Sequence, residues 1–137
     1  MCIRDRAALD LLRATGMNSH VARAMTTLGL VAASRGDHER ARTLHTDALA
    51  EAQSFADARG SALALEGLAD LAVREGDGDL AAWLLGSAAE HRGAGGGGSS
   101  GSASDAERIT REATDLIGEA AFAEGFSRGL NAALHST

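Results

Sequence analysis

Proline and tyrosine are absent from the 137-residue sequence, and aromatic residues make up only 3 % of it. Without proline, no residue of that kind interrupts a helix from within. The scarcity of aromatic residues argues against a sandwich or barrel, because strands favour aromatic and β-branched side chains. Apolar residues nevertheless reach 45 %, and many of them are alanine, which suits closely packed helices. We therefore predict an all-α protein.

Lysine is also absent, so all 13 basic residues are arginine, and the formal net charge is −6. An acidic chain without a basic cluster is a poor nucleic-acid binder, because such binding depends on neutralising phosphates. A Walker A loop is excluded as well, since that motif contains an invariant lysine. The lone cysteine, Cys2, excludes a disulfide framework. No apolar run approaches the roughly 18 residues that span a bilayer, so we predict a cytoplasmic protein that contacts neither nucleic acid nor membrane.

Two stretches of the sequence, 28–50 and 68–90, resemble each other at an offset of 40 residues. In each, apolar residues at helical spacing lead to a Gly-Asp pair, and a second apolar series follows. The glycine can adopt the left-handed conformation that ends a helix, and the aspartate can cap the next helix. Each stretch is therefore predicted to form a helical hairpin whose small residues let the two helices approach closely. The positions that carry this pattern are Leu28, Gly29, Ala32, Gly36, Asp37, Ala41, Leu44 and Ala48, followed by Leu68, Ala72, Gly76, Asp77, Ala81, Leu84, Leu85, Gly86 and Ala88.

The glycine–aspartate pairs set the predicted helix boundaries of a repeat region at 7–92. This region begins with the tail of a helix, continues with two hairpins, and contains a lengthened connection around 53–61. The predicted helices are 7–14, 19–34, 38–55, 58–74 and 79–91.

A Gly/Ser-rich linker at 93–104 separates this region from a predicted C-terminal helical cap at 105–137. Ser104 and Glu107 have the spacing of a capping box, in which each side chain bonds the other residue's backbone N–H. We therefore expect a helix at 105–117.

The last predicted helix, at about 119–128, ends at Gly129. It carries Phe122 and Phe126 one turn apart. Because a terminal repeat must hide its apolar face, we expect these two rings to cover the open end of the repeats.

The two hairpins resemble tetratricopeptide repeats. Their spacing is 40 residues rather than the usual ~34, and Ala32 and His45 stand where that family usually has aromatic residues. The resemblance implies a fragment of an α-solenoid, closed by the C-terminal cap. The residues that match the family's small and apolar signature are Leu28, Gly29, Ala32, Gly36, Asp37, Ala41 and Ala48.

A second resemblance is more specific. The segment ALEGLADLAVREGDGDLAAWLLGSAAEHR at 64–92 resembles a region near the C-terminus of large bacterial transcription regulators of the LuxR and SARP-like groups. LIGEAAFAEGFSRGL at 116–130 resembles their final block, with Phe126 where they often have tryptophan. The Gly/Ser linker departs from their proline-containing connection. The resemblance implies a non-catalytic scaffold for protein–protein or interdomain contact, with the NTPase and DNA-binding modules elsewhere in the parent regulator.

The first six residues, MCIRDR, resemble a translated sequencing adapter, so we treat 1–6 as an artefactual leader and expect the natural chain to continue upstream. If an upstream repeat is missing, the N-terminal face of the first repeat is left uncovered. We therefore expect that the chain could form a homodimer through this face. Two alternatives remain for the function. The repeats would be the regulatory tail of a protein kinase or nucleotide cyclase, or a free-standing adaptor in which Met1 is the true start.

No catalytic, cofactor-binding or metal site is predicted. His38 and His45 lie two turns apart on one predicted helix and lack a third ligand, and no motif places a base beside a nucleophile. Trp83 stands where the regulators have arginine. It would either anchor a partner segment or pack against the next helix or the C-terminal cap, and we favour packing.

Overall fold

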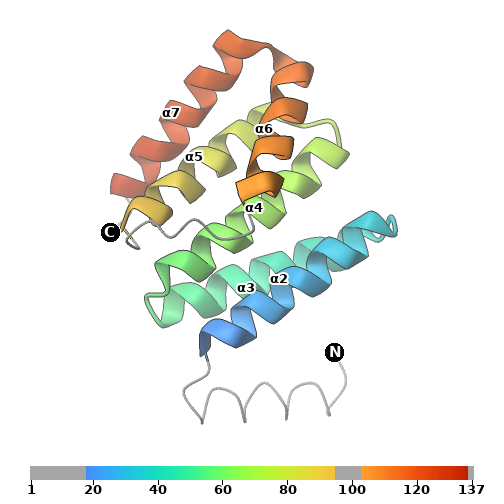
Figure 1. Cartoon of the computed structure of the whole chain (residues 1–137), viewed down its shortest axis with the longest axis vertical. Helices are drawn as coiled ribbons and strands as arrows, with labels where there is room; N and C mark the ends of the chain where they lie inside the picture. Colours follow the sequence, from blue (N-terminus) through green and yellow to red (C-terminus); the bar gives the residue numbers. More distant parts are fainter. Residues whose placement is uncertain (1–17, 95–102, 136–137) are drawn as a thin grey trace.

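The computed structural model describes residues 18–94 and 103–135, which contain six α-helices and no strand (Figure 1). The predicted all-α class is confirmed. The predicted leader at 1–6, the helix tail at 7–14 and most of the linker lie outside the described residues. The helices are α2 (Asn18–Ser34), α3 (His38–Ser54), α4 (Ala58–Arg74), α5 (Gly78–Ala94), α6 (Ala103–Ile117) and α7 (Glu119–His135).

The first four helices are equal in length, with 17 residues each, and three-residue corners separate them. Two corners lie where the glycine–aspartate pairs predict them, with Gly36 and Gly76 at φ of 86° and 82°. The aspartate of each pair caps the following helix, since Oδ1 of Asp37 accepts from the backbone N–H of residue 40 at 3.2 Å and Oδ1 of Asp77 from that of residue 80 at 3.1 Å. The predicted corners are therefore present with the expected chemistry.

The connection between α3 and α4 corrects one prediction. It is not lengthened, because α3 ends at Ser54 and α4 begins at Ala58. Ala56 takes the left-handed role with φ of 53°, and Asp57 caps α4 by accepting from the backbone N–H of Gly60 at 2.9 Å. The 40-residue offset thus consists of two 17-residue helices and two three-residue corners (17 + 3 + 17 + 3).

Each of α3, α4 and α5 packs against the preceding helix, and α2 also contacts α4. Further along the chain, α6 contacts α4 and α5, while α7 lies along α5 (Figure 1). Among the described helices, α3 and α5 make no contact with each other. The two helices therefore border α4 without covering it completely.

The main core lies between α4, α5 and α6 and is rich in alanine. Alanine methyl groups keep the helix axes close, and a few larger side chains fill the remaining space. The predicted alanines Ala32, Ala41, Ala48, Ala72, Ala81 and Ala88 are all buried, as are Leu84 and Leu85, and Leu44 and Leu68 are partly buried.

The apolar series predicted to lead to the first Gly-Asp pair is buried only in part. Ala32 is buried, but Leu28 is 53 % exposed, and Val31, which continues the series at helical spacing, is 41 % exposed. The face of α2 that meets α3 and α4 instead carries Val21 and Met25.

The C-terminal helices also differ from the prediction. Helix α6 begins at Ala103, so Ser104 lies inside the helix and cannot be its N-cap. Helix α7 runs through Gly129 to His135, so that glycine does not end it. None of the helices in the described ranges is long and apolar enough to cross a membrane.

Candidate interaction site

A groove of about 740 Å³ lies between α3, α4 and α5. It is present because α3 and α5 both pack on α4 but do not meet each other. Trp83 lines it and is 37 % exposed, and Ala132 of α7 also faces it. The larger apolar lining residues are Leu49, Leu65, Leu68, Trp83 and Leu84, and the polar ones are Gln53, Asp57, Ser61, Ser87 and His91.

The polar and apolar residues of this groove are segregated. Gln53 at the end of α3 and Ser61 at the start of α4 lie near the corner, whereas Leu68 lies two turns further along α4. On α5 the order is Trp83 first and then His91, whose Nδ1 donates to the carbonyl oxygen of Ser87 at 2.8 Å. Because α5 returns antiparallel to α4, the apolar residues share one end of the groove.

Two glycines bring the backbones of α5 and α7 into contact behind Trp83. A Cβ on Gly129 would overlap the carbonyl oxygen of Trp83, and a Cβ on Gly86 would overlap that of Phe126. Gly125, one turn before Gly129, packs over Ala82. The backbone of Trp83 therefore meets α7, while its side chain lines the groove.

Phe122 and Phe126 lie one turn apart on α7 with ring centroids 5.9 Å apart. Both are partly buried and pack against the main core cluster. Because α7 lies along α5, these two rings cover the side of the core that α5 faces.

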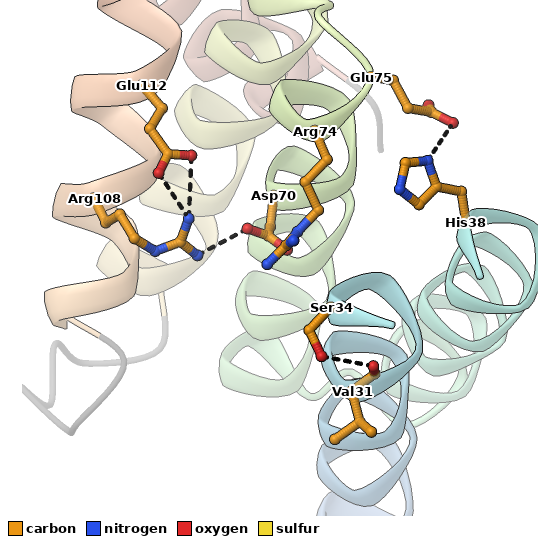
Figure 2. Close-up of polar contacts among 8 residues, drawn as sticks. All are labelled: Val31, Ser34, His38, Asp70, Arg74, Glu75, Arg108 and Glu112. Carbon is orange, nitrogen blue, oxygen red and sulfur yellow. Dashed lines mark hydrogen bonds and ion pairs between the residues drawn. The ribbon is translucent and has the colours of Figure 1, made fainter. Parts of the chain in front are cut away.

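A charged network joins α4 to α6 (Figure 2). Asp70 on α4 is 0 % exposed. Its carboxylate accepts from Nε of Arg74 at 2.9 Å and from Nη2 of Arg108 on α6 at 2.8 Å. Nη1 of Arg108 also donates to both carboxylate oxygens of Glu112 at 3.1 Å. Charge-assisted hydrogen bonds of this kind are about twice as strong as neutral ones, so they fix α6 on α4.

A second buried acid lies one turn before Asp70. Oε2 of Glu66 is 2.5 Å from Nη2 of Arg92 on α5. Burial raises the pKa of Glu66 to about 7; Arg92 opposes this shift, and Asp105 on α6 adds to it. Charged residues of three helices therefore act on the buried carboxyl of Glu66.

His45 fills a space between two glycines. It is 0 % exposed, and a Cβ on either Gly29 of α2 or Gly67 of α4 would collide with its imidazole ring. Neither ring nitrogen has a hydrogen-bond partner within the described residues. Burial lowers the pKa of His45 to about 4, against the weaker opposing attraction of Asp70. The ring is therefore neutral at pH 7. Gly29 and Gly67 leave the space that it occupies, because neither has a side chain.

His45 and Glu66 should produce opposite pH dependences of stability. The folded pKa of His45 is depressed from 6.5 to about 4, so its contribution is present above pH 6.5 and lost as the pH falls. The folded pKa of Glu66 is raised from 4.5 to about 7, so its contribution is present below pH 4.5 and lost as the pH rises. Between these limits the two effects oppose each other, and we expect the wild-type free energy of unfolding to vary little.

Single replacements separate the two effects. In Glu66→Gln, the free energy of unfolding should rise with pH between pH 4.5 and 6.5, by up to about 1.4 kcal/mol per pH unit. In His45→Leu, it should fall over the same interval. Urea denaturation at several pH values measures both slopes, and identical profiles for the wild type and the two variants would refute the assignment.

Within the described residues, no group of three or more His, Cys, Asp or Glu side chains could hold a metal ion. His38 and His45 face different partners, since Nδ1 of His38 is 3.5 Å from Oε2 of Glu75 while His45 is enclosed by glycines.

The buried charges were missed by sequence analysis. A signal was available, because Glu66, Asp70 and Arg74 follow each other at four-residue spacing in an otherwise apolar helix. The partner of Asp70 on α6, Arg108, lies 38 residues further along the chain, and nothing local indicates that pairing.

The chain was compared with family models, curated proteins and solved structures, and none of the three comparisons gives a match.

Proposed function

We propose that this protein is a non-catalytic, tetratricopeptide-like scaffold for protein contact, from the C-terminal region of a bacterial transcription regulator. The repeat assignment is supported by four equal helices at 20-residue intervals (17 + 3) and by the contact of α2 with α4, the next helix but one. The resemblance of residues 64–92 and 116–130 supports the regulator assignment.

The groove beside Trp83 is the single observation that carries the contact function. Its volume falls in the range of binding clefts, and it runs between α3 and α5, which both pack antiparallel on α4. A trough between helices suits an amphipathic helix, which lays its apolar face along the trough. The proposed occupant is a helix of a partner protein, with its apolar residues beside Leu68, Trp83 and Leu84.

Peptide selection tests this proposal. Helical peptides selected from a displayed library against the whole chain should shift the fluorescence of Trp83, which is the only tryptophan in the sequence. Trp83→Ala should weaken their binding roughly tenfold or more, because an exposed aromatic anchor is lost. Phe55→Ala is the matched control, since Phe55 is also an exposed aromatic but does not line the groove. Peptides that bind both variants as well as the wild type would overturn the groove assignment.

The regulator assignment has a separate test. Resequencing the source DNA across codons 1–7 and upstream should reveal NTPase and DNA-binding modules in the same reading frame. A kinase or cyclase module there would contradict it.

A further inference from the structure

A second surface lies on α2, away from the groove. Ala24, Leu28 and Val31 follow each other at helical spacing on its exposed side, and we call these three residues the α2 stripe. Leu28 and Val31 are among the most exposed large apolar residues of the described chain. An apolar row of this kind, at one-turn intervals, is the pattern that receives another helix.

The protein itself shows what covers the matching row on α4. Adding the 40-residue offset turns Ala24, Leu28 and Val31 into Ala64, Leu68 and Leu71. Ala64 is fully buried against Val21, Met25 and Ala48, which belong to the preceding α2–α3 pair. Leu71 is likewise buried against Ala32, Ala33 and Ala41 of the same pair. The α2–α3 pair therefore covers Ala64 and Leu71, while Leu68 between them is partly buried and lines the groove beside Trp83. Their counterparts Ala24 and Val31 on α2 are exposed, as is Leu28.

Charge distinguishes between the possible occupants. Helix α2 contains no acidic residue; Arg23 adjoins the stripe and Arg35 follows the helix. Two copies paired antiparallel through the stripe would bring these arginines together, which is repulsive. Residues 1–17 hold three arginines and two aspartates, so their sequence carries no excess of negative charge for these arginines.

We propose that the α2 stripe binds an acidic amphipathic α-helix of a partner protein. Its small and apolar residues pack on Leu28 and Val31, and its flanking carboxylates pair with Arg23 and Arg35. The surface is distinct from the groove beside Trp83, so this inference stands or falls independently of the groove assignment.

The test uses the whole chain and two synthetic helical peptides that differ only in flanking charge. Both carry alanine and leucine at helical spacing, one with glutamate flanks and the other with lysine flanks. Fluorescence anisotropy should show the acidic peptide binding roughly tenfold or more tightly than the basic one. Leu28→Asp should abolish this binding, and Arg23→Glu with Arg35→Glu should reverse the preference.

Two controls keep the outcome interpretable. Leu116→Asp alters an equally exposed leucine on α6 and should leave binding unchanged, as should Trp83→Ala. Circular dichroism verifies that each variant is folded. Equal binding of the two peptides overturns the proposal. So does a dimer that sediments as one species and is dissociated by Leu28→Asp, or an acidic-peptide affinity that rises when residues 1–16 are removed.

Discussion

Gly129→Ala should lower the free energy of unfolding by about 3 kcal/mol, at the upper end of what overpacking costs. A loss of stability would be informative, because replacing glycine by alanine inside a helix normally raises the free energy of unfolding by about 1 kcal/mol. Here the added methyl group meets the carbonyl oxygen of Trp83, a backbone atom that cannot rotate away. Relief requires α7 to move off α5, which would uncover part of the core under Phe122 and Phe126.

Gly93→Ala is the matched control for this experiment. Gly93 is also helical, but a Cβ there has no neighbour within 4 Å. We expect it to be neutral or to stabilise the protein by up to about 1 kcal/mol. Gly86→Ala should behave like Gly129→Ala, because the two glycines occupy opposite sides of the same contact. Urea denaturation of all three variants measures the effects, and a Gly129→Ala protein as stable as Gly93→Ala would show that α5 and α7 do not touch as described.

Removing both arginines from Asp70 should have the largest effect of any change considered. In the Arg74→Met, Arg108→Met double variant, the fully buried carboxylate loses both of its cationic partners. An uncompensated buried charge costs about 3–5 kcal/mol. Because Arg108 is also the link to α6, that helix should be the first to lose protection in hydrogen exchange.

Adding Asp70→Asn to the double variant separates charge from packing. The amide has nearly the shape of the carboxylate but carries no charge, so most of the lost stability should return. Arg128→Met is the control, since Arg128 pairs with Glu124 at an exposed site where ion pairs contribute about 0–1 kcal/mol. If the triple variant is no more stable than the double variant, the destabilisation comes from lost arginine packing and the charge argument is wrong.

Local chemistry explains which parts of the fold could be predicted. The corners at Gly36 and Gly76 depend on a few consecutive residues, so the sequence predicts them. The predicted boundaries of α2 and α4 differ from the observed ones by one residue at most. The corner at Ala56 is also left-handed but has no glycine to mark it, and the 40-residue offset was instead attributed to a lengthened connection. Gly129 shows the opposite ambiguity, because glycine marks both helix ends and close helix contacts, and only the position of α5 distinguishes them.

The candidate sites were less predictable for a different reason. Trp83 was singled out, but the groove exists only because α3 and α5 stay apart on α4. The exposure of Leu28 was not foreseen either, because the periodicity of α2 is apolar on more than one side. The spacing of apolar residues in the sequence does not show which apolar face of a helix packs against another helix.

The pattern of helix contacts has a consequence for how quickly the chain folds. Within the described residues, every pair of helices in contact is adjacent in sequence or separated by a single helix. Few long loops must therefore close before native contacts form, and helical proteins with such local topology fold within microseconds to milliseconds. Stopped-flow refolding should accordingly be complete within its dead time, with no slow phase from prolyl isomerisation, since the sequence has no proline.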